Sequence, residues 1–249
     1  MKLDLDKLNE QLENNTTFEI IEWAYNNFSN SKITISTSFG AEGTVLLDMV
    51  LRIQANPKVF TIDTGRNFQE TYNVWQELID RYKINIDVYA PDPQDIDDLQ
   101  KGHGPNLFYK DVELRKACCH ARKVKPMQKA LTGNELWISP LRREQSEFRK
   151  DIKILEWNAQ HNIYKISPLA KWSESDVWDY IRNNSLPYNK LYDQGYPTIG
   201  CQPCSRPVRP AESKRSGRWW WEDDANKECG IHIVDGKVIR KKNIADWNI

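Results

Sequence analysis

Five cysteines carry most of the reactive chemistry in this sequence. Four of them form two close pairs and the fifth stands alone near the end of the chain: Cys118, Cys119, Cys201, Cys204 and Cys229. Pro203 lies inside the second pair and Pro207 follows it, so this pair is expected in a short turn rather than a regular helix. In a reducing compartment an odd number of cysteines indicates metal binding or catalysis, not a disulfide framework.

Two close pairs of thiols fit either a Cys₄ zinc site or an iron–sulfur cluster. Zinc ribbons space each pair as C-x₂-C, whereas Cys118 and Cys119 are adjacent. Neighbouring helical residues point about 100° apart, so both thiols reach one centre only from a bent or unwound turn. Two other interpretations stay open: a thioredoxin-like redox pair at Cys201 and Cys204, and buried cysteines without a reactive role.

Cys229 is a candidate nucleophile. Cations lower the pKa of a thiol and so raise the fraction of thiolate, which is the reactive form. Gly230 gives this tail backbone freedom. The alternative is an incidental surface cysteine, and His232 judged alone fits a structural role as well as a catalytic one. The nearby cationic or ionisable side chains are Arg215, Arg218, Lys227 and His232.

Strand-like and helical segments alternate along the first 186 residues. Strands are expected at 33–35, 59–62, 84–89, 135–139 and 163–166. Helices are expected at 17–28, 44–51, 68–82, 108–131 and from Ser173, where Ser173 and Asp176 resemble a capping box. This alternation predicts an α/β fold, a parallel twisted sheet with helices on both faces. Ligands of such sheets bind at the carboxyl ends of strands, where loops 36–43, 63–67 and 139–149 converge.

The loop after the first strand is a candidate anion cradle. Its residues are Ser38, Phe39, Gly40, Ala41 and Glu42. Serine hydroxyls, backbone N–H groups and a helix N-terminus together can bind an anion. It is not a Walker loop, because no Gly-Lys-Ser/Thr follows. The alternative is an ordinary tight strand-to-helix turn.

Arginines follow two of the expected strands. Thr64, Gly65 and Arg66 end the second strand, and a forked guanidinium there could hold a phosphate or sulfate. Arg142, Arg143 and Arg149 stand within eight residues after a later strand and could clamp a dianion. A solvated charged loop is the alternative.

Composition narrows the possible partners. Lys and Arg total 35, as do Asp and Glu, so the net charge is zero and neither nucleic acid nor a membrane is an expected partner. The N-terminus is too polar for a signal peptide and no apolar run approaches about 20 residues, so a cytoplasmic location is expected. We expect residues 1–186 to form a nucleotide-binding domain carrying Cys118 and Cys119. Residues 187–249, rich in Pro, Gly, Arg and Trp, would form an appendage with the other three cysteines.

Taken together, these motifs resemble the assimilatory adenylyl-sulfate and phosphoadenylyl-sulfate reductases, from about Ser36 to His232. The matching segments occur in the family's order: Ser38–Glu42, Asp63–Arg66, Cys118-Cys119-x-x-Arg122-Lys123, Leu141–Ser146, Cys201-x-x-Cys204-x-Arg206-Pro207, Gly217–Glu222 and Glu228-Cys229-Gly230-x-His232. The resemblance implies an adenine-nucleotide α-hydrolase-like fold related to ATP pyrophosphatases, ending in a C-terminal catalytic tail.

The resemblance also implies a cofactor and a reaction. Members with both cysteine pairs bind a [4Fe–4S] cluster, here on Cys118, Cys119, Cys201 and Cys204, and prefer adenosine 5′-phosphosulfate. The thiolate of Cys229, with His232 beside it, attacks the sulfur, releases AMP and becomes an S-sulfocysteine. Thioredoxin or a similar thiol donor then releases sulfite, a step of sulfate assimilation and cysteine biosynthesis. A homo-oligomer is expected.

The substrate-binding residues implied by the resemblance come from the loops and from the cations after them. They are Ser38, Phe39, Gly40, Ala41, Glu42, Thr64, Gly65, Arg66, Lys123, Arg143, Arg149, Arg215 and Arg218. Lys123 is expected between cluster and substrate, linking the two electrostatically. Gly43 and Pro140 depart from the family, since many members carry Asp and Gly at these positions.

Three other functions remain possible from the sequence. The first is the same chemistry on 3′-phosphoadenosine 5′-phosphosulfate. The second is an ATP pyrophosphatase or tRNA-thiolation enzyme, although the loop lacks the Asp expected for ATP and magnesium. The third is a Cys₄ metal scaffold without enzymatic activity, which would leave Cys229 and the arginines unexplained.

Overall fold

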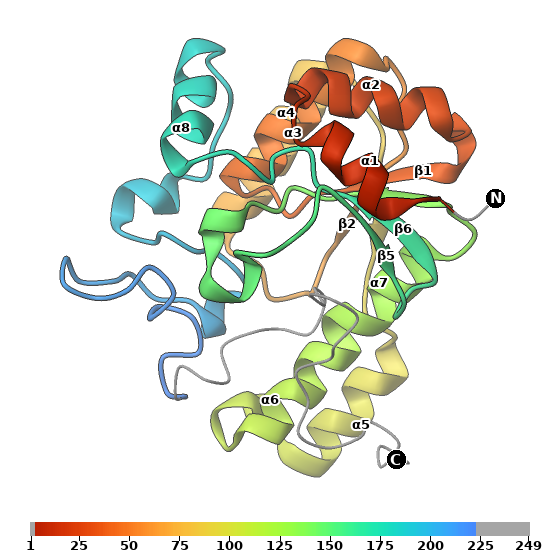
Figure 1. Cartoon of the computed structure of the whole chain (residues 1–249). Helices are drawn as coiled ribbons and strands as arrows, with labels where there is room; N and C mark the ends of the chain where they lie inside the picture. The colour runs from red at the N-terminus through yellow and green to blue at the C-terminus, as the bar shows by residue number, and fades with distance from the viewer. Residues whose placement is uncertain (1–2, 223–249) are drawn as a thin grey trace.

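A six-stranded sheet forms the centre of the computed structural model, which describes residues 3–222 (Figure 1). Its strand order is β3-β2-β1-β4-β6-β5. The strands are β1 (Ile33–Ser36), β2 (Val59–Ile62), β3 (Ile86–Tyr89), β4 (Leu136–Ile138), β5 (Leu155–Asn158) and β6 (Ile163–Ile166). Five run parallel, which confirms the predicted parallel sheet. The exception is β5, an edge strand that pairs antiparallel with β6 and was not predicted.

Eight α-helices surround the sheet in the described part of the chain (Figure 1). They are α1 (Leu5–Leu12), α2 (Thr17–Asn27), α3 (Ala41–Ile53), α4 (Gln69–Tyr82), α5 (Pro93–His103), α6 (Val112–Cys119), α7 (Lys125–Leu131) and α8 (Glu174–Asn183). The predicted capping box is present at α8, where the Ser173 hydroxyl accepts a hydrogen bond from the Asp176 N–H and the Asp176 carboxylate accepts one from the Ser173 N–H. None of these helices is long and apolar enough to cross a membrane.

Helices cover both faces of the sheet, as predicted. Side chains alternate along a strand, so Ile33 and Ile35 of β1 point to one face, where they pack with apolar residues of α2, α3 and α4. Phe60 of β2 and Trp137 of β4 point to the other face and pack against α7. The N-terminal helices and α5–α7 accordingly lie on opposite sides of the strands in Figure 1.

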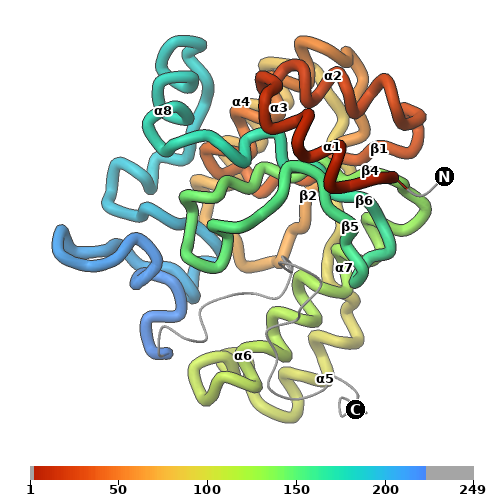
Figure 2. The backbone as a smooth tube through the Cα atoms, viewed as in Figure 1, coloured from red at the N-terminus to blue at the C-terminus, as the bar shows by residue number. Residues whose placement is uncertain are grey.

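The strand order determines at which edge of the sheet a ligand can bind. From β1 the chain proceeds outward to β2 and β3, then crosses back to β4 on the other side of β1. The loops that leave β1 and β4 therefore diverge, which opens a crevice at the carboxyl ends of these two strands. The segment after α8, blue in Figure 2, runs past this edge and supplies further residues to it.

The predicted helix over 108–131 is wrong in detail. The structure has a 3₁₀ helix at Leu107–Tyr109, then α6, then a π-helical turn at His120–Val124, then α7. Helix α1 was not predicted either. The side chain of Asn9, on α1, bonds the backbone of Leu155 through both its oxygen and its nitrogen, so α1 and β5 hold each other in place.

Candidate active site

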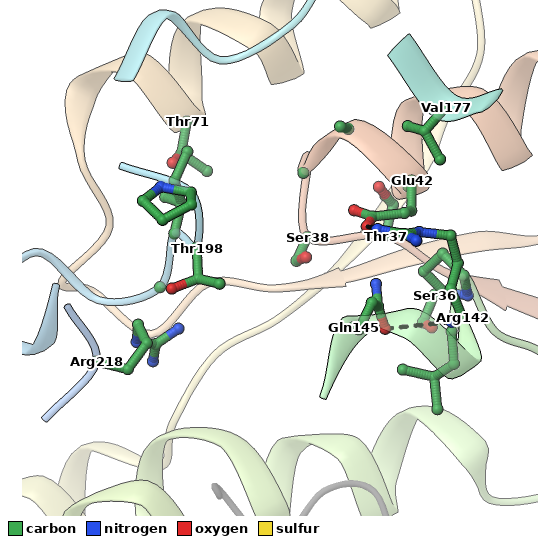
Figure 3. A pocket seen from close by; sticks show the side chains of 18 of the residues that line it. Ser36, Thr37, Ser38, Glu42, Thr71, Arg142, Gln145, Val177, Thr198 and Arg218 are labelled. Carbon is green, nitrogen blue, oxygen red and sulfur yellow. Dashed lines mark hydrogen bonds and ion pairs between the residues drawn. The ribbon is translucent and has the colours of Figure 1, made fainter. Parts of the chain in front are cut away.

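A cavity of about 310 Å³ opens at the carboxyl ends of β1, β2 and β4 (Figure 3). The loop after β1 forms one wall, and the segment 140–149 forms another. Residues 197–200 and 214–219 of the C-terminal segment close the opposite side. In Figure 3 Ser38 lies between Glu42 with Arg142 on one side and Thr198 with Arg218 on the other.

The loop after β1 has the geometry of an anion cradle. Phe39 takes a left-handed backbone conformation, with φ of 59°, and its N–H donates to the Thr37 hydroxyl. The Phe39 ring points away from the cavity and stacks on the Trp75 ring. Phe39 therefore fixes the conformation of the loop without lining the cavity. Ser38, Gly40, Ala41 and Glu42 do line it. Gly40 caps α3 without any side-chain hydrogen bond, which leaves N–H groups at the helix start directed at the cavity.

Gly43 lets the first turn of α3 approach this loop closely. A Cβ atom at this position would lie 2.9 Å from the Thr37 hydroxyl oxygen. The absence of a side chain here therefore tightens the cradle without removing a ligand group from it.

Cations outnumber acids around the cavity. The basic residues are Lys123, Arg142, Arg149, Lys214, Arg215 and Arg218, and the acidic residues are Glu42, Glu144 and Glu174. Arg142 donates to Glu42 from two nitrogens, at 3.0 and 2.9 Å, and also to Glu144, so it braces the wall. Lys214 pairs with Glu174.

Arg218 is the buried cation on the opposite wall. Its Nε donates to the Cys204 carbonyl at 3.1 Å and its guanidinium lies 4.6 Å from the Trp219 ring centroid. It forms no ion pair with any residue in 3–222. A buried guanidinium beside a cavity that pairs with no carboxylate of the described residues favours an anionic ligand.

Two of the predicted substrate-binding cations do not line the large cavity. Arg143 turns away from the cavity: its Nε donates to the Ile152 carbonyl at 3.0 Å and its terminal nitrogens pair with Glu13. This ion pair depends on the packing of α1, which the sequence pattern did not reveal. Arg66 lies 4.9 Å from the Phe108 ring centroid and donates to the Pro105 carbonyl, beside the cysteines instead of the larger cavity.

Of the other predicted residues, five more line the cavity, Gly65 does not, and two lie outside residues 3–222. Thr64, Lys123, Arg149, Arg215 and Arg218 line the cavity. Gly65 does not; with φ of 68° it makes the turn that follows Thr64. Cys229 and His232 fall outside the described residues.

Four cysteines line a second, much smaller cavity that adjoins the first. Cys118, Cys119, Cys201 and Cys204 are all buried and none is in a disulfide. They pack with Leu107, Phe108 and Trp219. Three arginines and a lysine also line this space: Arg66, Arg115, Arg122 and Lys123. Lys123 therefore borders both cavities.

The helix changes its winding directly after the two adjacent thiols, which share one cavity. Helix α6 ends at Cys119 and the π-helical turn begins at His120. A π-helix has a wider turn, so it shifts the side chains relative to an α-helix. Both cysteines still belong to α6, so the distorted turn follows the thiols and does not contain them.

A 3₁₀ turn holds the second pair. Pro203 occupies the turn and the Cys204 N–H donates to the Cys201 carbonyl at 2.9 Å. The Gln202 N–H donates to the Arg66 carbonyl at 2.8 Å, which ties this turn to the loop after β2. The Cys201 thiol donates to the Thr64 hydroxyl at 3.3 Å. Because Thr64 also lines the large cavity, it forms part of the wall between the two spaces.

The thiols differ in their electrostatic surroundings. Burial acts to raise the pKa of Cys201, but the positive charges of Lys123, Arg218 and Arg122 outweigh it, so this pKa is lowered. Burial raises the pKa of Cys204 to about 12, with the neighbouring Cys201 adding to the effect. Burial also raises the pKa of Cys118. The small cavity therefore combines positively charged side chains with closely packed cysteine sulfurs.

Unpartnered indole groups also border the cysteines. The Nε1 atoms of Trp219 and Trp221 are buried and have no hydrogen-bond partner among the described residues. Buried donors normally have an acceptor, and Trp219 belongs to the same buried cluster as the four cysteines. Within residues 3–222 no three His, Cys, Asp or Glu side chains are arranged to hold a single metal ion.

A model of the phosphoadenosine phosphosulfate reductase domain matches residues 32–207. The chain belongs to this family. Adenosine 5′-phosphosulfate reductase of Allochromatium vinosum is 44% identical over 200 residues, covering 80% of this chain and 78% of that protein. The enzyme of the same name from Pseudomonas aeruginosa strain LESB58 is 40% identical over 244 residues, covering 96% and 89%. The resemblance to this reductase family is thereby confirmed, and with it the expectation of an enzyme.

Solved structures agree with the fold. Phosphoadenylyl-sulfate reductase from Candida auris, in a phosphate complex, superposes with a TM-score of 0.71 at 28% identity, covering 84% of this chain and 99% of that one. The FMN adenylyltransferase of Candida glabrata, in complex with FAD and pyrophosphate, reaches 0.56 at 17% identity, covering 94% of this chain and 82% of that one. The second likeness concerns the fold alone, and it agrees with the predicted adenine-nucleotide architecture.

Proposed function

We propose that this chain reduces adenosine 5′-phosphosulfate to sulfite and AMP. One observation carries this proposal: a cationic cavity with an anion cradle adjoins a cavity lined by four cysteines. Lys123 borders both cavities, and Thr64 of the first is hydrogen-bonded to Cys201 of the second. The names of the curated relatives support the choice of this nucleotide. Sulfate assimilation and cysteine biosynthesis would use this reaction, in the cytoplasm, where thiols stay reduced.

The reaction needs two thiol steps. The Cys229 thiolate attacks the sulfur of the sulfuryl group, an S–S bond forms, and the bond from sulfur to the bridging oxygen breaks. AMP leaves with the electron pair of that bond. A thiolate of thioredoxin or a similar dithiol then attacks Cys229 Sγ and expels sulfite, and its second thiol resolves the mixed disulfide. The dithiol is oxidised by two electrons and the sulfuryl sulfur is reduced by two.

Cations make the first step feasible. A thiolate and a phosphosulfate are both anions, so their approach needs positive charge, and so does the departing phosphate. Arg149, Arg215 and Arg218 line the cavity and are proposed for this role together with Lys123. We assign no substrate contact to Arg143 or Arg66, given their other partners. His232 is proposed to assist Cys229 from the tail.

We propose that Cys118, Cys119, Cys201 and Cys204 hold a [4Fe–4S] cluster. Four buried thiols, flanking cations and buried indole N–H groups that lack a partner within residues 3–222 suit an anionic, sulfur-rich group. A single tetrahedral zinc ion needs its four sulfurs about 3.8 Å from one another, given zinc–sulfur bonds near 2.3 Å. Within residues 3–222 no three cysteine sulfurs are arranged around a single ion in this way, so a cluster is proposed in place of zinc. When bound, it would supply rigidity and a local electrostatic field.

Two further proposals concern the domain organisation of the chain and its oligomeric state. The chain would consist of a nucleotide-binding domain at 1–186 and an appendage at 187–249 that brings Cys201, Cys204 and Cys229 to it. It would act as a homo-oligomer, with no nucleic acid or membrane as a partner.

The test is sulfite formation by protein purified without oxygen, with thioredoxin as the donor. The proposal predicts a higher kcat/KM for adenosine 5′-phosphosulfate than for its 3′-phosphorylated form, and about four iron and four sulfide per chain. The matched variant Cys201→Ser should lose iron. The reverse preference would make the 3′-phosphorylated nucleotide the substrate. Zinc without iron would refute the cluster, and pyrophosphate released from ATP without sulfite would refute the reductase.

A further inference from the structure

Tyr192 is a residue at the anion cradle that no sequence motif indicated. It belongs to the 3₁₀ helix Lys190–Gln194, about 150 residues after the loop that it contacts. Its hydroxyl oxygen accepts a hydrogen bond from the Ala41 N–H at 3.1 Å. Ala41 is the first residue of α3, so Tyr192 supplies the cap that Gly40 cannot provide.

The position of the phenol is fixed by packing. The Trp178 ring of α8 meets the Tyr192 ring edge to face, with centroids 5.1 Å apart. On the other side Gly40 lies so close that a Cβ atom there would be 3.4 Å from the Tyr192 oxygen. Its backbone is held as well, because the Tyr192 N–H donates to the Asn189 carbonyl. The hydroxyl therefore stays at the start of α3, on the wall of the large cavity.

The Tyr192 O–H has no acceptor for its proton among residues 3–222. A phenol can accept hydrogen bonds and donate one, and the bond from Ala41 uses only the accepting function. The structure gives no acceptor for the Tyr192 O–H among residues 3–222. Burial raises the pKa of the phenol, and the negative charge of Glu42 adds to this, so the proton is retained at neutral pH.

The groups around the Tyr192 hydroxyl indicate which kind of ligand it can donate a hydrogen bond to. In the described structure the backbone N–H groups of Glu42 and Gly43 have no partner, and they lie in the same first turn of α3. With the Ser38 hydroxyl they make a set of donors without a bound acceptor. A set of converging donors at a helix N-terminus is matched by an oxyanion.

We infer that the Tyr192 hydroxyl donates a hydrogen bond to a phosphate or sulfuryl oxygen of the bound nucleotide while its oxygen caps α3. This inference rests on the proposed function and adds a binding residue to it. The phenol thereby links the backbone conformation at the start of α3 to binding of the anion. Its contact is to the charged end of the nucleotide and not to the nucleoside.

The test compares ADP with adenosine as ligands of the purified, cluster-loaded full chain by calorimetry. ADP is unreactive and its β-phosphate stands in for the sulfuryl group. Tyr192→Phe keeps the ring and removes only the hydroxyl, and the Ala41 N–H can then bond water in the open cavity. We expect ADP to bind roughly 10- to 100-fold more weakly, as for loss of a hydrogen bond to a charged group. Adenosine affinity should stay within about twofold, because the nucleoside does not meet the phenol.

Tyr188→Phe is the matched control. Tyr188 packs on the same Trp178 ring, but its hydroxyl bonds Asp193 and it does not line the cavity. It should bind both ligands as the wild type does. Unchanged ADP affinity in Tyr192→Phe, or an equal loss for ADP and adenosine, would overturn the inference while sulfite formation by the wild type stands. A wild-type protein that neither binds ADP nor forms sulfite would overturn the proposed function as well.

Discussion

The Arg115 guanidinium and the Glu222 carboxylate form a two-point ion pair, with nitrogen–oxygen distances of 2.8 and 2.6 Å. Their side chains are only 1% and 2% exposed. Arg115 also lies 4.6 Å from the Trp219 ring centroid and borders the cysteine cavity. The pair joins α6 to the last described residue, so it fixes the end of the segment that precedes Cys229 in the sequence.

Breaking this ion pair should destabilise the protein strongly. Glu222→Gln removes the carboxylate charge that pairs with the buried Arg115 guanidinium, which should cost about 3–5 kcal/mol of unfolding free energy. Denaturant unfolding of wild type and variant gives this value. The control is Glu113→Gln, which breaks the exposed Glu113–Lys116 pair on the same helix and should cost less than about 1 kcal/mol. Similar losses in the two variants would contradict the role assigned to the buried pair.

Gly200 offers a way to displace Arg218 without replacing it. A Cβ atom at Gly200 would overlap the Arg218 guanidinium, which is the end of a flexible side chain and can shift. Gly200→Ala should therefore fold and keep its iron, yet lose roughly 10-fold or more in kcat/KM for the phosphosulfate nucleotide. Gly102→Ala is the matched control, since no atom lies within 4 Å of a Cβ there, and its kcat/KM should match the wild type. Full activity of Gly200→Ala would argue against Arg218 as an anion ligand.

His161 should make the protein sensitive to mild acid. Burial and the positive charge of Lys165 lower its pKa from 6.5 to about 4, so the folded protein holds the neutral ring. The unfolded chain binds a proton near pH 6.5, so the stability from this effect is complete above that pH. It is lost as the pH falls from 6.5 through 4, by about 2 kcal/mol after allowance for partial exposure.

His161→Gln removes this titration. The variant's unfolding free energy should fall less than that of the wild type between about pH 7 and pH 5, as measured by denaturant unfolding at each pH. Parallel pH curves for the two proteins would show that His161 titrates normally in the folded state.

Much of the fold follows from local sequence patterns. The β-branched run Ile33–Ile35 and the apolar spacing of residues 68–82 each specify one element, because they reflect burial on one face. The loop after β1 was recognisable because its Ser and Gly residues stand where a strand meets a helix. The cysteine pairs were recognisable by spacing alone.

Other features depend on contacts that are distant in the sequence. The antiparallel strand β5 is anchored by Asn9, and Arg143 is drawn away by Glu13, both across at least 130 residues. The π-helical turn after Cys119 has no simple residue signal. Tyr192 resembles any other aromatic residue until the fold brings its hydroxyl to Ala41. Such relationships arise only when the segments are packed together.

The most direct test of the account is a single turnover with ³⁵S-labelled adenosine 5′-phosphosulfate and no thiol donor. We predict one equivalent of AMP per chain and the label bound covalently to the peptide that contains Cys229. Added thioredoxin should release this label as sulfite, and Cys229→Ser should bind none while keeping its iron. Label on the Cys201–Cys204 peptide, or AMP released without any covalent label, would contradict the account.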